Sequence, residues 1–193
     1  MALAVTENTT NRSKIDSKKL ALLIGCASIV MMFAGLTSAY IVRRAGGNWL
    51  EFKLPNIFFI NTIVMLLSSV AIHSAYLSFK KGNEVLYKGL LVLSFILGLA
   101  FVVLQYQGWL DLTAIGVELT GNPAGSFVYV ISGIHAAHVL GGLAAILVAM
   151  IQAFSLKYKV TKKRKLRFEL TLIYWHFVDF LWIYLLLFFL SQQ

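Results

Sequence analysis

Long apolar stretches, separated by short polar segments, dominate this chain of 193 residues. Each of five stretches supplies the roughly 20 apolar residues that a helix needs to cross the hydrocarbon core of a membrane. The pattern predicts an all-α polytopic membrane protein, a bundle of five transmembrane helices at about residues 20–42, 55–79, 88–109, 127–155 and 170–190. Residues 20–193 are expected to form one transmembrane domain, preceded by a polar cytoplasmic tail at residues 1–19.

Proline and glycine mark the expected helix ends. Pro55 suits the first turn of the second helix, where a missing backbone N–H costs nothing. The run Gly121-Asn122-Pro123-Ala124-Gly125 is typical of a turn. The fourth helix is therefore predicted to begin near Ser126.

Positive charge is distributed unevenly between the two sides of the predicted bundle. Of 17 Lys and Arg residues, all but Arg43, Arg44 and Lys53 lie in the tail, the second-to-third loop or the fourth-to-fifth loop. The positive-inside rule then places the N-terminus inside and the C-terminus outside. The net charge of +9 is attributed to this topology and to anionic lipid headgroups, not to nucleic acid. The candidate lipid-contact or interface residues are Trp175, Trp182, Arg43, Arg44, Lys163 and Arg164.

Composition limits the chemistry that the chain supplies by itself. Hydrophobic residues make up 59% of it and charged residues 13%, as expected for a membrane protein. Cys26 is the single cysteine, so the chain has no internal disulfide, no thiolate pair for copper or iron–sulfur binding, and no motif for covalent haem. No redox centre is expected in this chain. The first apolar run is longer than the core of a signal peptide and is expected to remain as an anchor.

The fifth predicted helix carries the polar groups that most need an explanation. Asp179 is its only formal charge, and His176 lies three residues earlier on the same helix face. A carboxylate without a partner at the middle of a bilayer costs at least ~2.5–3.5 kcal/mol. Asp179 is therefore expected to form a hydrogen bond with His138 of the adjacent fourth helix, or to be held by His176.

Two further histidines lie in the fourth predicted helix. His135 and His138 share one face at a spacing that suits metal ligands, but the other helices offer too few Glu, Asp or Cys residues to complete a site. Hydrogen bonds between helices are expected for both instead. His73, near the inner end of the second helix, is interpreted as an interfacial residue in preference to a proton relay. No catalytic or metal site is predicted; the candidate structural and proton-supporting cluster is His135, His138, His176 and Asp179.

Three stretches resemble motifs of subunit III of haem-copper respiratory oxidases. They are residues 133–141 (GIHAAHVLG), residues 174–182 (YWHFVDFLW) and residues 33–40 (FAGLTSAY). The similarity extends over all five predicted helices and is to the short bacterial form of the family. Two family carboxylates are absent, since Ile29 and Gly108 occupy their positions. Roles that depend on those acids therefore do not carry over to this chain.

The resemblance implies a non-catalytic subunit of a proton-translocating terminal oxidase in the bacterial inner membrane. Its partners would be the catalytic subunit I, subunit II and membrane lipids, with a larger respiratory supercomplex as a further possibility. Haem and copper are expected in the partner subunits and none in this chain. The family's usual roles are to stabilise the catalytic subunit, to hold phospholipid in a cleft and to support proton uptake.

Three alternatives remain open from the sequence. In the first, the complex is a quinol oxidase or a relative associated with nitric-oxide reductases, because this subunit does not determine the electron donor. A small proton-coupled transporter would use Asp179 and His176 as a relay and would need broken helices or an inverted repeat. A membrane metalloenzyme would need a larger set of ligands than the chain supplies.

Overall fold

The computed structural model describes residues 16–192, and five long helices account for most of this range. They are α1 (Ser17–Ala45), α2 (Ile57–Lys81), α3 (Glu84–Ala114), α4 (Pro123–Ser155) and α5 (Lys162–Ser191). All five are, by length and composition, long and apolar enough to cross a membrane, which confirms the all-α class and is consistent with five transmembrane spans. Residues 1–15 of the predicted tail lie outside the described residues, whereas residues 17–19 already belong to α1.

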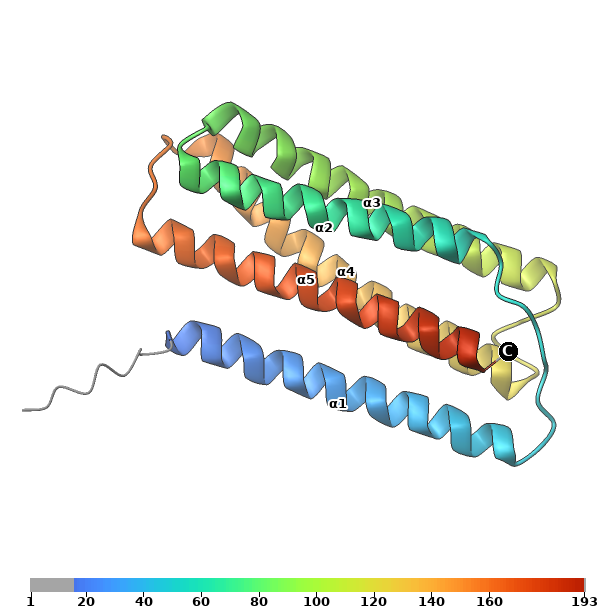
Figure 1. Cartoon of the computed structure of the whole chain (residues 1–193). Coiled ribbons are helices and arrows are strands. Elements are labelled where there is room, and N and C mark those ends of the chain that lie inside the picture. Colours follow the sequence, from blue (N-terminus) through green and yellow to red (C-terminus); the bar gives the residue numbers. More distant parts are fainter. Residues whose placement is uncertain (1–15, 193) are drawn as a thin grey trace, which may run out of the picture.

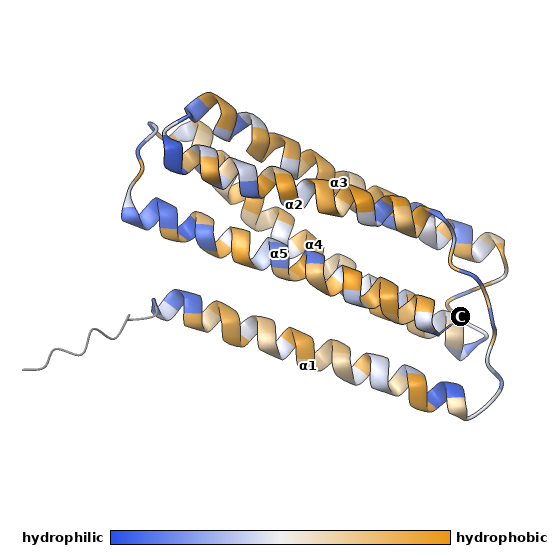
Figure 2. Ribbon diagram, viewed as in Figure 1, coloured by the Kyte–Doolittle hydropathy of each residue, from blue (hydrophilic) through white to orange (hydrophobic). Residues whose placement is uncertain are grey.

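Hydropathy varies along the helices as a membrane requires. Figure 2 shows apolar residues through the middle of the bundle and polar residues collected at its two ends. The helices extend beyond the predicted spans because backbone hydrogen bonding continues past the apolar stretch into the polar ends. α5, for example, begins at Lys162 and not near residue 170.

The start of α4 differs from the prediction. The helix begins at Pro123 and not near Ser126, because the first helical position does not need the N–H that proline lacks. The side chain of Asn122 accepts a hydrogen bond from the backbone N–H of Ala124 at 2.9 Å and caps the helix. Gly125 provides close packing: a Cβ there would lie 2.3 Å from the carbonyl oxygen of Glu118.

Four of the helices form a closed bundle, and α1 packs on its outside. α2 packs against α3 and α5, and α4 packs against α3 and α5, which closes the ring. α1 contacts only α4 and α5 among the described helices. Figure 1 shows α1 beside α5, on the side away from α2 and α3.

The centre of the bundle is built around Trp175 of α5, which is fully buried. A Cβ on Gly98 of α3 would lie 2.8 Å from the indole ring, and so would a Cβ on Gly142 of α4. Small residues that permit such close approach are a typical means of packing helices in lipid. The two glycines therefore allow α3 and α4 to close on α5 at one level.

The two tryptophans of α5 correct the sequence interpretation. Trp175 and Trp182 were expected at a lipid or interface position, yet both are 0% exposed. Aromatic belts form at helix ends, whereas these residues lie within α5 on the face turned to its neighbours. They are core residues.

Hydrogen bonds between side chains connect the helices at several levels. The indole N–H of Trp182 donates to Thr62 Oγ1 on α2 at 2.9 Å. The amide of Asn61 donates to Gln105 on α3 at 3.0 Å, and both residues are buried. Further such pairs include Ser68–Ser94, Trp109–Ser132 and Thr37–Tyr184.

Thr62→Val is expected to destabilise the bundle by ~0.6–1 kcal/mol, because it removes the acceptor of the Trp182 indole while keeping the side-chain shape. Titration of the purified protein with sodium dodecyl sulfate measures this change. Thr171→Val is the matched control, since its hydroxyl bonds only to Arg167 of its own helix. An equal loss in both variants would contradict a specific α2–α5 bond.

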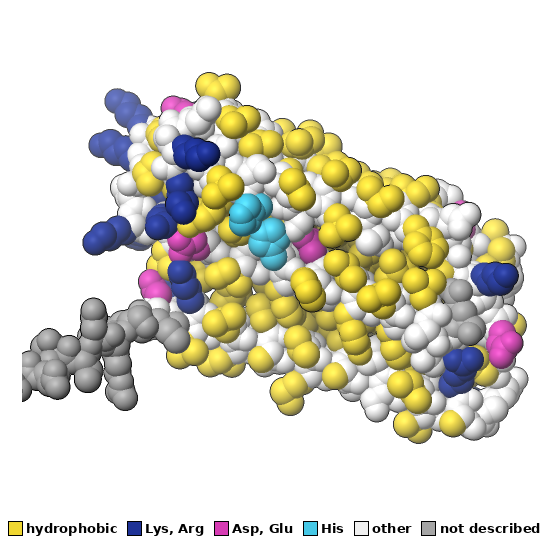
Figure 3. All heavy atoms as spheres, viewed as in Figure 1, with side chains coloured by type: hydrophobic (Ala, Val, Ile, Leu, Met, Phe, Trp, Pro, Cys, Tyr) yellow, Lys and Arg dark blue, Asp and Glu magenta, His cyan; other side chains and the backbone are white. Residues whose placement is uncertain are grey.

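The two ends of the bundle differ in charge. Figure 3 shows most of the visible Lys and Arg side chains at the end where α1 begins and α4 joins α5. At this basic end Glu169 of α5 accepts a hydrogen bond from Tyr76 of α2 and forms an ion pair with Lys19 of α1, both at 2.5 Å. Glu169 thus connects three helices. At the opposite end Arg44 donates to Gln192 at 3.0 Å and Arg43 to Gly47 at 3.1 Å.

Candidate functional site

Asp179 is the deepest carboxylate of α5. The residue is only 4% exposed, and neither carboxylate oxygen has a hydrogen-bond partner within residues 16–192. The nearest basic group is His176, whose Nδ1 lies 3.9 Å from Asp179 Oδ2. Of the two partners expected from the sequence, His176 is the one in reach.

His138 does not hold Asp179. Its Nδ1 donates to the carbonyl oxygen of Ile134, in its own helix, at 2.8 Å. The expectation rested on similar depth in adjacent helices, but depth does not fix the direction in which a side chain leaves each helix. His138 instead packs edge-on against Phe33 of α1.

His135 likewise makes no hydrogen bond between helices. It is fully buried, and its two ring nitrogens lack partners among the described residues. Its ring stacks on Trp182 with centroids 5.0 Å apart and meets Phe101 edge-on. The histidines of α4 therefore take part in aromatic packing, and they are separate from the Asp179 environment.

The group that gathers around His176 comes from α2. Ser69 Oγ lies 2.5 Å from His176 Nδ1, and His73 Nδ1 lies 3.4 Å from His176 Nε2. Both ring nitrogens of His176 are thus in contact with side chains of α2, and Asp179 lies about one turn further along α5. We call these four residues, His73, Ser69, His176 and Asp179, the α2–α5 polar cluster.

The α2–α5 polar cluster runs from the surface into the protein. His73 is exposed, the side chain of His176 is 38% exposed, and that of Asp179 is 6% exposed. Histidine side chains adjoin one another within the otherwise apolar face seen in Figure 3. Every member carries an exchangeable proton or can accept one.

Helical spacing extends this polar line toward the basic end. On α5, Glu169 precedes His176 by two turns and therefore lies on the same face. On α2, Tyr76 follows His73 by about one turn, and Tyr76 donates to Glu169. The α2–α5 contact thus carries polar groups from the bundle end to Asp179.

An imidazole bonded at both nitrogens can take a proton at one and release one at the other. His176 has this arrangement between His73 and the Ser69–Asp179 side. The distance of 3.9 Å between His176 Nδ1 and Asp179 Oδ2 exceeds hydrogen-bond length by about 1 Å, so proton transfer from His176 to Asp179 needs a small side-chain movement. The geometry suits stepwise proton transfer. Within residues 16–192, no three His, Cys, Asp or Glu residues cluster as metal ligands would.

An apolar cleft of about 680 Å³ lies beside the cluster, between α1 and α5. His176 forms part of its wall, and Tyr184 is its other polar lining residue. The apolar lining is Val30, Phe33, Ala34, Ile173, Phe177, Phe180 and Leu181. The cleft exists because α1 packs on α5 without reaching α2.

Sequence reasoning missed the α2 half of the cluster. His73 was interpreted as an interfacial residue in preference to a proton relay, and no chemical role was predicted for Ser69. The sequence does indicate that Ser69 and His73 share a face of α2, because they are four residues apart. Nothing in the sequence, however, indicates that this face meets His176.

Comparison with known proteins identifies the kind of protein that carries this bundle. The profile of the family described as cytochrome c oxidase subunit III matches residues 19–191. The probable cytochrome c oxidase subunit 3 of Mycobacterium tuberculosis H37Rv is 28% identical over 186 residues, covering 93% of this chain and 90% of that protein. Cytochrome c oxidase subunit 3 of Corynebacterium diphtheriae is 31% identical over 162 residues, covering 80% and 78%.

The rat protein of the same name is 28% identical over 178 residues, which cover 86% of this chain but 66% of the rat protein. A multi-helix membrane subunit of a respiratory oxidase is thus the class to which the fold and the comparisons point. The chain belongs to the cytochrome c oxidase subunit III family, in the five-helix form that matches bacterial relatives. It is a subunit of the oxidase complex and associates with other oxidase subunits.

Proposed function

We propose that this subunit supports proton uptake by the catalytic subunit through the α2–α5 polar cluster. Protons enter at the basic end near Glu169, pass along His73 and His176, and are held near Asp179. The observation that carries this proposal is the continuous contact of His176 with His73 at 3.4 Å and with Ser69 at 2.5 Å.

The proposed orientation places the basic end, and with it the N-terminus, on the inner side of a bacterial plasma membrane. The lysine and arginine residues of the α4–α5 loop support it through the positive-inside rule. An entry at this end would then draw protons from the cytoplasmic side, which is where an outward-pumping oxidase takes them up.

The proposed partner face is the one that carries His73. A titratable side chain exposed at membrane depth is costly against lipid, and a protein neighbour removes that cost. His73 lies about 12 Å from the end of α2 at Lys81, well within the apolar zone. We therefore place subunit I against this face, with subunit II and the metal centres beyond it.

The α1–α5 cleft is the proposed site of bound phospholipid chains. Its walls are almost entirely apolar, and its volume of about 680 Å³ suits acyl chains. A chain held there would fill the gap beside His176 and stiffen the contact of α1 with α5. This would stabilise the subunit and, through it, the complex.

The test of the proposed function uses the purified complex. Affinity purification through this chain is expected to co-purify the haem-containing catalytic subunit, and isolation of this chain alone would contradict the assignment.

His73→Gln is expected to slow oxygen consumption about twofold at pH 9 and little at pH 6.5, because uptake is limited by proton supply only when protons are scarce. His138→Gln, outside the cluster, is the matched control; equal slowing in both would overturn the relay.

A further inference from the structure

The two halves of α1 are packed differently against the bundle. In the half farther from the basic end, Phe33, Thr37 and Tyr40 are buried. In the half that begins at the basic end, Ser17–Met32, Cys26 is the one buried residue. We call Ser17–Met32 the α1 arm. In its most apolar stretch α1 is also the least buried of the five helices, so little apolar contact holds the arm in place.

Aromatic packing and a hydrogen bond fix the other half of α1. The hydroxyl oxygen of Thr37 lies 2.9 Å from that of Tyr184 on α5. The ring of Tyr40 meets Phe127 of α4 and Phe188 of α5 edge-on, with centroids 5.7 and 5.2 Å apart. Edge-on pairs of this kind are favourable beyond the apolar area that they bury. This half of α1 therefore has a defined position on α4 and α5.

A single polar contact holds the α1 arm. Lys19 forms an ion pair with Glu169 of α5 at 2.5 Å, and within residues 16–192 no other polar side chain of the arm reaches another helix. The two side chains are 34% and 19% exposed, so water competes for both charges and the pair constrains the arm only modestly. The next polar contact along α1, at Thr37, lies about 27 Å further on. The arm is thus a long segment with one weak attachment near its end.

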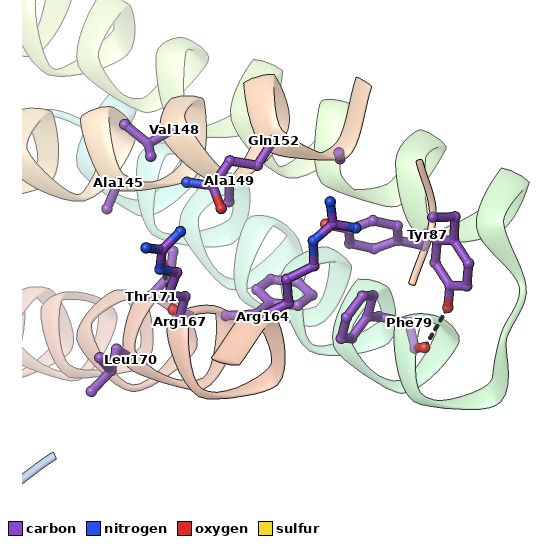
Figure 4. Close-up of a pocket in the computed structure, with 13 residues that line it drawn as sticks. Phe79, Tyr87, Ala145, Val148, Ala149, Gln152, Arg164, Arg167, Leu170 and Thr171 are labelled. Carbon is purple, nitrogen blue, oxygen red and sulfur yellow. Dashed lines mark hydrogen bonds between the residues drawn. The ribbon is translucent and has the colours of Figure 1, made fainter. Parts of the chain in front are cut away.

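α5, in contrast, is fixed at the basic end. The loop before it is held by Tyr158, which donates to the carbonyl oxygen of Phe79 at 2.6 Å, a hydrogen bond drawn in Figure 4. Phe168 of α5 is 4% exposed and packs edge-on against the ring of Phe79. Because these contacts anchor α5 on α2, loss of the Lys19–Glu169 pair would displace α1 and leave α5 in place.

Displacement of the α1 arm would change the α1–α5 cleft. Val30 of the arm contributes to the cleft wall on the α1 side, and Ile173, His176 and Phe177 contribute on the α5 side. The α1 side continues with Phe33, where the firmly packed half of α1 begins. A movement of the arm away from α5 would therefore widen the part of the cleft that is nearer the basic end.

We propose that the α1 arm is a movable gate of the α1–α5 cleft. The Lys19–Glu169 pair closes the gate. When the pair breaks, the arm pivots away from α5 about the contacts of Thr37 and Tyr40, and the wall that carries His176 becomes accessible from the basic end. The gate follows from the packing of α1 and stands whether or not the α2–α5 polar cluster carries protons.

Cys26 reports the position of the arm, because it is the only cysteine of the chain and is buried when the gate is closed. The test measures its alkylation by N-ethylmaleimide in the purified oxidase complex, followed by mass spectrometry of this subunit. Lys19→Gln is expected to raise the alkylation rate about threefold, since it removes the one ion pair of the arm. Lys18→Gln removes an exposed charge that pairs with no carboxylate of residues 16–192, and is expected to react as the wild type does. Equal rates in the two variants would overturn the gate.

Two further variants separate the gate from general damage to the fold. The double variant K19E/E169K restores opposite charges at the two positions, so its alkylation rate is expected to return to that of the wild type. A rate as high as that of Lys19→Gln would contradict a gate closed by this ion pair. Arg44→Gln breaks the polar contact at the far end of α1 but leaves the packing of Tyr40, and is expected to leave the rate unchanged. A rise equal to that of Lys19→Gln would mean that α1 detaches as a whole, which would overturn the pivot.

Discussion

Gly142→Ala is expected to reduce the amount of this subunit in the purified oxidase complex, although alanine is normally favoured over glycine in a helix. The new Cβ would lie 2.8 and 3.0 Å from two ring carbons of Trp175 and 3.3 Å from Tyr174. Trp175 is fully buried and cannot move aside without displacing α3, because Gly98 lies against the same ring. Overpacking of this kind costs about 1–3 kcal/mol.

The adjacent glycine provides a matched control for Gly142→Ala. A Cβ on Gly141 would meet nothing closer than the Tyr174 hydroxyl at 3.6 Å. Gly141→Ala is therefore expected to be neutral or to stabilise the helix by up to ~1 kcal/mol through propensity alone. The midpoint of unfolding in sodium dodecyl sulfate and the subunit content of the complex measure the difference. Similar midpoints for the two variants would show that the close contact at Trp175 does not limit stability.

Asp179→Asn is expected to leave assembly intact and to lower oxygen consumption at pH 9 several-fold. Asparagine has nearly the same shape, so the packing of this buried position is retained, but its amide cannot take up and release a proton as a carboxyl group does. If protons reach the catalytic subunit by way of Asp179, the rate falls most where bulk protons are scarce. Rate measurements from pH 6 to pH 9, with the haem absorption spectrum and subunit content, test this.

The outcomes for Asp179→Asn separate a proton role from a structural one. Loss of the subunit at every pH would indicate that Asp179 acts in packing. A changed haem spectrum in an intact complex would indicate a direct effect on the metal site. Asp111→Asn, the same chemical change in α3 near the opposite end of the bundle, is expected to leave the pH profile as it is.

The number and approximate positions of the helices were predictable because lipid imposes one simple requirement, about 20 apolar residues per span. The uneven distribution of basic residues between the two sides of the bundle was also predictable, because it follows from which predicted loops contain Lys and Arg. The proximity of Asp179 to His176 was also predictable, since residues three apart in one helix share a face whatever the tertiary structure.

Contacts between helices were not predictable from one sequence. The expectation that Asp179 bonds to His138 used only the depth of the two residues and the adjacency of their helices. The pattern does not reveal how each helix is rotated about its axis, and that rotation directs the side chains elsewhere. The contact between His73 and His176 could not be predicted for the same reason, because it depends on the rotation of α2 and α5 about their axes. Nearly uniform apolarity around each helix leaves no stripe from which to infer the buried face.

The order in which the helices are made adds a consequence to the position of α1. α1 ends at Ala45, yet its only neighbours among the described helices, α4 and α5, begin at Pro123 and Lys162. At about 5–20 residues per second, a nascent α1 waits several seconds in the bilayer before either neighbour is synthesised. Its stretch from Leu20 to Val42 has no charged residue, so α1 is stable in lipid without a helical neighbour during that time. Asp179, the carboxylate that is most costly in lipid without a partner, lies in α5, the last helix to be synthesised. By then Ser69 and His73 of α2 are already in the membrane.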